Sequence, residues 1–163
     1  MKIRNKKFIY LISPNKIKDN SFFYYLSLVL RTNKVRFFQL RLKKETIKRK
    51  TFIAKKVQII CKKYRVKFII NDDPYFTLKI KADGCHLGQK DMNVIEARKI
   101  LKNKIIGITC HNSVRLAKKA KLNGASYIAI GAFFKTNTKK VLYKANVKTL
   151  KKLNQKFNLL NSS

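Results

Sequence analysis

Three short segments of this 163-residue chain carry polar side chains that suit the binding of a phosphorylated molecule. They are Gln39-Leu40-Arg41-Leu42-Lys43, Asn71-Asp72-Asp73 and Gly88-Gln89-Lys90-Asp91. Mg²⁺ prefers one or two carboxylates together with phosphate oxygens and water. Arginine and lysine neutralise the phosphate charge that remains after the metal has bound. The set therefore predicts a magnesium-bound diphosphate, with Asp72 and Asp91 as the candidate metal ligands.

Two later segments add hydroxyl, imidazole and amine groups. They are Thr109-Cys110-His111-Asn112 and Lys135-Thr136-Asn137-Thr138-Lys139. The alternative interpretation makes Asp72 or Asp91 a helix N-cap and the lysines ordinary solvated side chains. That alternative suffices for any one residue taken alone. A binding site is favoured because every segment follows a short apolar run, so that the whole set is predicted to lie on one rim.

Cys85-His86 and Cys110-His111 raise the question of zinc. Adjacent residues of a strand point to opposite faces, so the two members of such a pair do not easily share one metal ion. We therefore interpret the histidines as groups that pack or hydrogen-bond within the fold. No Ser/His/Asp or Cys/His arrangement indicates a covalent nucleophile, and no catalytic nucleophile is predicted.

Six apolar, β-branched or aromatic runs predict strands, and segments with helical spacing lie between them. The predicted strands are 8–13, 35–40, 66–70, 84–88, 105–109 and 127–131. The clearest helical spacing is that of Ile53, Val57, Ile60, Cys61 and Tyr64. Further helices are predicted around 94–101, 113–124, with Ser113 as N-cap and Gly124 as C-cap, and 147–157.

This alternation predicts βαβ units and a parallel sheet in a single α/β domain spanning residues 1–163. An open doubly wound sheet and a barrel both fit. Length favours the open sheet, because an eight-unit barrel usually needs roughly 200 residues or more. No Gly-rich GxGxxG motif follows the first strand, which excludes the dinucleotide-binding type of open sheet. In either fold, ligands bind at the carboxyl ends of the strands, where the polar segments lie.

The charge is extreme, with 40 Lys+Arg against 7 Asp+Glu and a formal net charge of +33. Such a field attracts RNA and other polyanions. The basic residues are dispersed from Lys2 to Lys156, which favours a drifted, solvated surface over a selected nucleic-acid site. RNA binding is therefore predicted to be weak, nonspecific and steeply salt-dependent. Three cysteines without a CxxC motif, and no signal or membrane-spanning segment, predict a cytoplasmic protein.

Taken together, the motifs resemble the thiamine-phosphate synthase (thiamine-phosphate pyrophosphorylase) family. The resemblance is carried by Gln39-Leu40-Arg41-x-Lys43, Asn71-Asp72, Ala82-Asp83-Gly84-x-His86-Leu87-Gly88-Gln89-x-Asp91 and Gly124-Ala125-x-Tyr127-x-Ala129-x-Gly131. The resemblance extends from Tyr10 to about Leu160. The four motifs together are specific for the family, whereas none of them is specific alone. The family's thiazole tautomerase branch has a catalytic histidine at the place of Ala132, so that branch is disfavoured.

The resemblance implies a parallel (β/α) barrel of the TIM type and a Mg²⁺-dependent transferase. Such an enzyme joins hydroxymethylpyrimidine diphosphate to hydroxyethylthiazole phosphate and releases pyrophosphate. Asp72 and Asp91 match the Mg²⁺ ligands, and Thr136 and Thr138 match the thiazole-phosphate loop. The positions that match contacts to the pyrimidine diphosphate are Gln39, Arg41, Lys43, Asn71, Thr109 and Lys139.

The family also continues past the sixth helix with strand 7, a Gly-Gly turn, helix 7 and strand 8. We therefore expect an incomplete barrel of about six βα units that binds the pyrimidine diphosphate better than the thiazole phosphate. Three functional interpretations stay open. The chain is an enzyme, alone or with a second chain that completes the barrel; it is a non-catalytic diphosphate-binding remnant; or it is a basic RNA-binding protein on the same scaffold.

Overall fold

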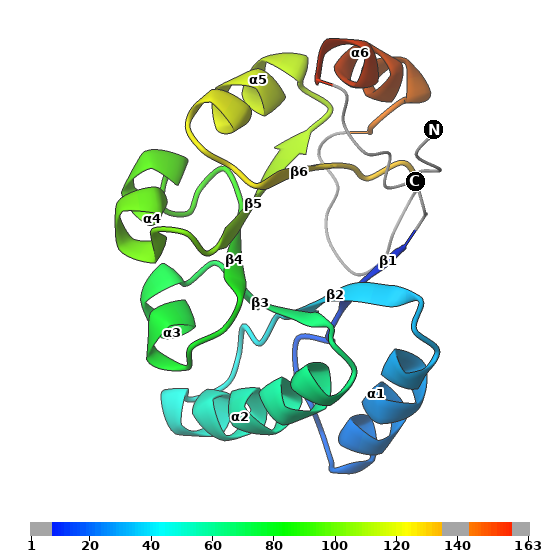
Figure 1. Cartoon of the computed structure of the whole chain (residues 1–163), viewed down its shortest axis with the longest axis vertical. Helices are drawn as coiled ribbons and strands as arrows, with labels where there is room; N and C mark the ends of the chain where they lie inside the picture. Colours follow the sequence, from blue (N-terminus) through cyan, green and yellow to red (C-terminus); the bar gives the residue numbers. More distant parts are fainter. Residues whose placement is uncertain (1–7, 135–143, 158–163) are drawn as a thin grey trace. The chain divides into compact units, whose positions relative to one another are not determined.

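Strands and helices alternate along the whole of the described chain (Figure 1). The computed structural model describes residues 8–134 and 144–157, with side chains to residue 153. All six predicted strands are confirmed, with bounds within two residues of those expected. The elements are β1 (Ile9–Ile12), α1 (Ser21–Arg31), β2 (Val35–Leu40), α2 (Ile47–Lys63), β3 (Lys67–Asn71), α3 (Pro74–Lys79), β4 (Gly84–Leu87), α4 (Val94–Leu101), β5 (Ile105–His111), α5 (Val114–Leu122), β6 (Tyr127–Ile130) and α6 (Val147–Phe157).

The chain divides into two compact units, and each is described by itself. The N-terminal unit is Phe8–His86, and the C-terminal unit comprises the described residues from Leu87 onward. In the N-terminal unit, β1, β2, β3 and β4 lie side by side in chain order, and all three pairings are parallel. Their carboxyl ends therefore lie at one edge of the sheet. The single-domain expectation for residues 1–163 stays a prediction.

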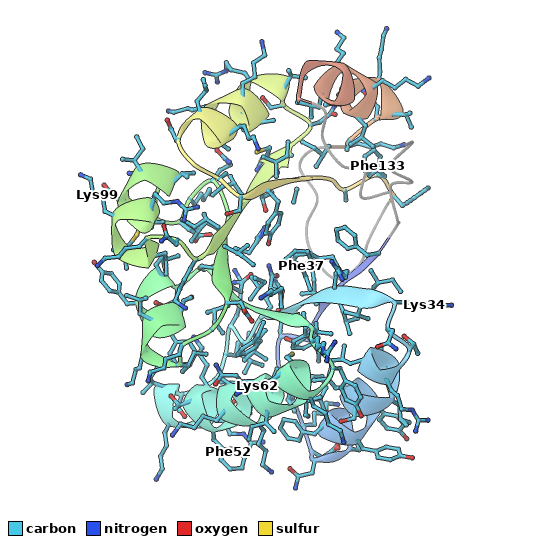
Figure 2. All side chains as sticks on the ribbon, in the orientation of Figure 1. Lys34, Phe37, Phe52, Lys62, Lys99 and Phe133 are labelled. Atoms are coloured by element: carbon cyan, nitrogen blue, oxygen red, sulfur yellow. The ribbon has the colours of Figure 1, made fainter. Side chains whose placement is uncertain are left out.

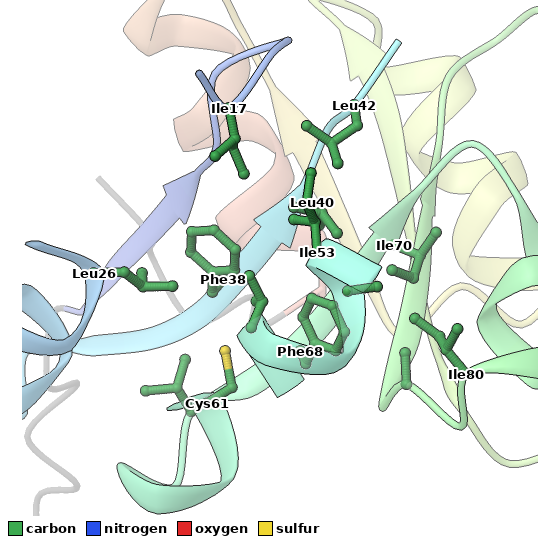
Figure 3. Packing of buried hydrophobic residues seen from close by; sticks show 14 of the residues in the cluster. Ile17, Leu26, Phe38, Leu40, Leu42, Ile53, Cys61, Phe68, Ile70 and Ile80 are labelled. Atoms are coloured by element: carbon green, nitrogen blue, oxygen red, sulfur yellow. The ribbon is translucent and has the colours of Figure 1, made fainter. Parts of the chain in front are cut away.

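One face of the N-terminal sheet packs against helices. Phe38 and Phe68 are paired across β2 and β3, and both side chains are buried. Leu26 of α1 and Ile53 of α2 belong to the same cluster (Figure 3). Burying such a side chain stabilises the fold by about 1.5–3 kcal/mol. This core fixes the positions of the strands whose ends carry the candidate site.

The opposite face of the same strands is aromatic and polar. Figure 2 shows Phe37 on the side of β2 that faces away from α1 and α2. The Tyr10 ring stacks on Phe37 with centroids 5.6 Å apart and meets the His86 ring edge-on at 6.3 Å. Because side chains alternate along a strand, Gln39 lies on this face with Phe37. This face is the one that carries polar groups towards the candidate site.

Side chains of Thr46, Asp73, Asn93 and Ser113 cap the amino ends of α2, α3, α4 and α5. The predicted N-cap Ser113 is thereby confirmed, since its Oγ accepts a hydrogen bond from the Leu116 N–H at 3.2 Å. The predicted C-cap was one residue too late. Asn123 is the C-cap of α5, and the glycine after it takes the left-handed conformation with φ +93°.

In the C-terminal unit, β5 pairs with β6 in parallel, with Thr109 opposite Ala129. The Ala145 N–H donates to the Ala132 carbonyl oxygen at 2.8 Å, and the Asn146 N–H donates to Asn112 Oδ1 at 3.3 Å. These bonds fix the start of α6 beside the ends of β5 and β6. The candidate positions Thr136, Thr138 and Lys139 lie outside the described residues.

Gly107 of β5 lies beneath the ring of Tyr127 on β6, and a Cβ at this position would overlap that ring. We expect Gly107→Ala to destabilise the protein by about 1 kcal/mol, because the ring must swing aside from its packed position. Urea denaturation measures this. In a Tyr127→Leu background the same substitution is expected to cost much less. An equal cost in both backgrounds would exclude the ring as the cause.

Candidate active site

The loop after β1 holds the backbone and side chain of Arg41. The Ser13 N–H donates to the Gln39 carbonyl oxygen at 2.9 Å, and Ser13 Oγ accepts from the Arg41 N–H at 2.8 Å. Arg41 Nη1 donates to Asn15 Oδ1. Ser13 is buried, whereas Arg41 is half-buried. The guanidinium is thus positioned by the neighbouring strand end and still reaches solvent, where a phosphate can bind it.

Gln39 is buried in spite of its polar side chain, with 2% of its surface exposed. Its Nε2 donates to the Tyr10 hydroxyl at 3.1 Å. A buried amide without partners would be costly, so this bond helps to keep the side chain on the aromatic face. The amide oxygen and the second N–H of Nε2 can serve a heterocycle placed against that face.

Lys43 and Asp72 form an ion pair at the carboxyl ends of β2 and β3, with Nζ and Oδ2 3.2 Å apart. The side chains are 49% and 31% exposed, so the pair itself contributes little to stability. Its significance is positional. A cation and a carboxylate, each accessible to solvent, lie within reach of one bound group. Asn71 precedes Asp72 as the last residue of β3.

Asp72 has a left-handed backbone conformation, with φ +65°. Its N–H donates to the His86 carbonyl oxygen at 2.8 Å, which fixes the peptide after β3 to β4. The helix cap is the next residue, since Asp73 Oδ1 accepts from the Phe76 N–H at 2.8 Å. Asp72 is therefore not the N-cap of α3.

Asp91 is also not a helix N-cap. Its Oδ2 accepts from the Gly88 N–H at 2.6 Å and closes the turn after β4. Asn93 caps α4 by accepting from the Glu96 N–H at 3.0 Å. The N-cap alternative thus fails for both candidate metal ligands. An exposed carboxylate held by a backbone turn is a suitable oxygen ligand for Mg²⁺.

Thr109 is half-buried on β5, and its carbonyl oxygen accepts a bond from Gln89 Nε2 at 2.5 Å. Within the C-terminal unit, Gln89 therefore links the turn that carries Asp91 to the strand that carries Thr109. Sequence reasoning quoted Gln89 as part of a motif and gave it no role. It equally missed Ser13 and Asn15, although serine and asparagine directly after a strand are the types that hydrogen-bond neighbouring backbone and side chains.

The structure brings together Gln39, Arg41, Lys43, Asn71 and Asp72 at one edge of the N-terminal unit. Asp91 and Thr109 belong to the C-terminal unit. The joint Mg²⁺ site of Asp72 and Asp91 therefore stays a prediction.

The three cysteines, Cys61, Cys85 and Cys110, are free and buried. Burial away from water raises the pKa of the Cys61, Cys85 and Cys110 thiols to about 12. We expect iodoacetamide at pH 8 to label none of them in the folded protein and all of them in urea, because the thiolate is the nucleophile. Mass spectrometry gives the count, and rapid labelling without urea would contradict the burial.

The same shift has a consequence for stability. A folded-state pKa raised above the ordinary thiol value of roughly 8.5 means that the thiols stay protonated to a higher pH in the folded state than in the unfolded state. This contribution is fully present below about pH 8.5 and is lost as the pH rises towards 12. Alkaline pH is therefore expected to destabilise the fold.

The donor set at the candidate site fits Mg²⁺ better than a soft metal. Among residues 8–134 and 144–153, no group of three or more His, Cys, Asp or Glu side chains could hold a metal ion. Mg²⁺ needs fewer protein ligands, because substrate phosphates and water complete its octahedron.

In the same part of the chain, residues 8–134 and 144–153, no helix is long and apolar enough to cross a membrane.

Comparison with known proteins agrees with this geometry. The model of the family "Thiamine monophosphate synthase" matches residues 9–160. The chain belongs to this family. Its resemblance to "Thiamine-phosphate synthase" of Pelagibacter ubique (strain HTCC1062) is 62% identity over 91% of this chain and 72% of that protein. The protein of the same description from Fusobacterium nucleatum is 43% identical over 89% of this chain and 70% of its own length.

A solved structure shows the same fold. Thiamine phosphate pyrophosphorylase from Pyrococcus furiosus superposes with a TM-score of 0.79 and 26% identity, over 94% of this chain and 72% of that one. The predicted thiamine-phosphate synthase family, the transferase class and the TIM-barrel type of parallel α/β fold, with about six βα units, are thereby confirmed. The role of each site residue is not tested by these comparisons.

Proposed function

We propose that this member of the thiamine monophosphate synthase family binds hydroxymethylpyrimidine diphosphate, with Mg²⁺, at the carboxyl ends of β2 and β3. The observation that carries the proposal is the Lys43–Asp72 ion pair at this edge. A phosphate–Mg²⁺ group presents both signs of charge, and the pair offers a partner for each. Arg41, held by the loop after β1, adds a second cation.

The reaction is a transfer to hydroxyethylthiazole phosphate in thiamine biosynthesis. The bond between the pyrimidine methylene carbon and the diphosphate oxygen breaks, and its electron pair leaves with pyrophosphate. The thiazole nitrogen then captures the pyrimidine-methyl cation. Negative charge builds on the leaving group, where Arg41, Lys43 and Lys139 stabilise it. Gln39 orients the pyrimidine ring on the aromatic face, and Thr109 supplies a hydroxyl to it.

Asp72 and Asp91 would hold the Mg²⁺, with Asn71 beside it. When bound, the ion supplies Lewis-acid stabilisation of the departing pyrophosphate. The protein residues neutralise the charge of the leaving group, orient the substrates and exclude water. No covalent nucleophile is required. Thr136 and Thr138 are proposed to bind the phosphate of the thiazole substrate. The reaction belongs to cytoplasmic metabolism, and polyanion binding is expected to be incidental.

Isothermal titration calorimetry with the pyrimidine diphosphate, in the presence and absence of Mg²⁺, tests the proposal. We expect tight binding with Mg²⁺, much weaker binding without it, and weaker binding still of the thiazole phosphate. A product assay with both substrates measures the transfer. If neither substrate binds, the proposal fails and the non-catalytic remnant is favoured. RNA that binds sequence-specifically at high salt would favour the third interpretation.

A further inference from the structure

The Lys43–Asp72 ion pair engages the carboxylate at which the metal ion is proposed to bind. Lys43 Nζ lies 3.2 Å from Asp72 Oδ2. A Mg²⁺ ion held by a carboxylate oxygen lies about 2.0–2.1 Å from that oxygen. An ammonium and a metal ion on one carboxylate are two neighbouring cations, and like charges at such short range repel each other. Each of the two cations therefore lowers the affinity of Asp72 for the other.

A second ion pair of the N-terminal unit has the same length but a different support. Lys67 Nζ lies 3.2 Å from Asp83 Oδ1. The other carboxylate oxygen, Asp83 Oδ2, accepts a hydrogen bond from the Phe68 N–H at 2.9 Å, so the backbone holds this carboxylate as well. Among the described residues, Lys43 is the one hydrogen-bonding or ionic partner of the Asp72 carboxylate. The Asp72 carboxylate can therefore exchange its lysine for another cation without breaking a bond to the backbone.

Of the two members of the Lys43–Asp72 pair, the lysine is the one that can move. The Asp72 N–H donates to the His86 carbonyl oxygen at 2.8 Å, which fixes the backbone that carries the carboxylate. The Lys43 side chain is 49% exposed, and an ion pair this accessible to water is weak. A lysine ammonium is a compact charge with three donors on a flexible stem. Lys43 can thus turn from Asp72 to the oxygens of a diphosphate bound at the same edge.

We propose that Lys43 competes with Mg²⁺ for Asp72 until a diphosphate binds and accepts the hydrogen bonds of the lysine. This inference rests on the proposed function, since it requires that Asp72 holds the metal ion. The diphosphate draws Lys43 away and thereby raises the affinity of Asp72 for Mg²⁺. Because coupling between two ligands is reciprocal, Mg²⁺ raises the affinity for the diphosphate by the same factor. This coupling adds to the direct attraction between metal and phosphate, and it disfavours the binding of the metal alone.

Titration with Mn²⁺, followed by electron paramagnetic resonance, tests the proposal without an activity assay. Mn²⁺ prefers the same octahedral oxygen ligands as Mg²⁺, and the signal of the free ion gives the bound fraction. Each variant is titrated with and without inorganic pyrophosphate, the leaving group of the proposed reaction. The association of Mn²⁺ with pyrophosphate in solution is the same for every variant. Differences between variants therefore come from the protein.

Lys43→Met is expected to raise the affinity for Mn²⁺ alone about fivefold, the factor that corresponds to the stronger exposed ion pairs. The gain in Mn²⁺ affinity that pyrophosphate brings is expected to fall by at least the same factor. Lys67→Met is the matched control, because it removes the same charge from a pair of the same length at the opposite end of β3. It is expected to leave both affinities unchanged. Asp72→Asn is expected to weaken Mn²⁺ binding about tenfold or more, since the metal loses its charged ligand.

The outcomes separate this inference from the proposed function. If Asp72→Asn weakens Mn²⁺ binding but Lys43→Met does not strengthen it, the competition is refuted and the metal site stands. An equal rise in Lys43→Met and Lys67→Met also refutes the competition, because net charge and not the ion pair would then set the affinity. If the unaltered chain binds no Mn²⁺ with or without pyrophosphate, or if Asp72→Asn has no effect, the metal site and this inference both fail. Urea denaturation of each variant verifies that it is folded.

Discussion

Asp72→Asn is expected to lower kcat/KM for the transfer reaction by about 10²–10³-fold and to weaken the Mg²⁺-dependent binding of the pyrimidine diphosphate. The substitution keeps the size of the side chain but removes the charge that pairs with Lys43 and is proposed to hold Mg²⁺. Lewis-acid stabilisation of a leaving group contributes several kcal/mol, and each 1.4 kcal/mol is about a factor of ten in rate. Steady-state kinetics at several Mg²⁺ concentrations measure the loss.

The chain supplies a matched control at the next position. Asp73→Asn removes an adjacent carboxylate with the same chemistry, but asparagine caps a helix about as well as aspartate. Because the role of Asp73 is the bond to the Phe76 N–H, this variant is expected to keep its activity. Equal losses from both substitutions would mean that negative charge in general, and not the Asp72 carboxylate, supports the reaction. Activity unaffected by Asp72→Asn would refute its assignment as a ligand.

The fold was predictable because its strands are short, largely apolar runs separated by segments with helical spacing. The run Tyr127–Ile130 is apolar without alternation, which is a pattern typical of parallel strands. What the pattern did not indicate was the choice between an open sheet and a barrel. That choice depends on strand tilt and closure, which leave no local signature in one sequence. Length pointed to the open sheet, and only the family motifs pointed to the barrel type.

The candidate site was predictable to the extent that its residues follow strands directly. Arg41 and Asp72 were found in this way. The residues that hydrogen-bond to Arg41 were not found, because Ser13 and Asn15 lie 28 and 26 residues away from it in the sequence. Such long-range bonds depend on which strands are neighbours. The cap assignment also needed the structure, since two consecutive aspartates offer the same chemistry and only the backbone conformation distinguishes them.

Arg98 was missed for the same reason, and it ties together three segments of the C-terminal unit. From the last turn of α4, its guanidinium donates to the Gly124 carbonyl oxygen, with Nη2 at 2.6 Å, and to that of Lys104 at 2.7 Å. It also donates to the Lys102 carbonyl oxygen and, at 3.3 Å, to Ser126 Oγ. Partial burial lowers its pKa. These contacts lie at the amino ends of β5 and β6, where residues in this fold serve stability and not catalysis.

Arg98→Ala is therefore expected to lower the free energy of unfolding by about 2–3 kcal/mol, which urea denaturation measures. Hydrogen bonds from a charged donor contribute roughly 1.5–3 kcal/mol each, but the half-exposed position lets water replace part of them. Arg98→Lys is expected to recover little, because an ammonium cannot reproduce the planar fork that reaches both loops. Lys99→Ala, at the exposed neighbouring position, is expected to cost less than about 0.5 kcal/mol. If Arg98→Ala costs no more than Lys99→Ala, the two loops are held by backbone bonds such as that from the Ser126 N–H to the Ile106 carbonyl oxygen.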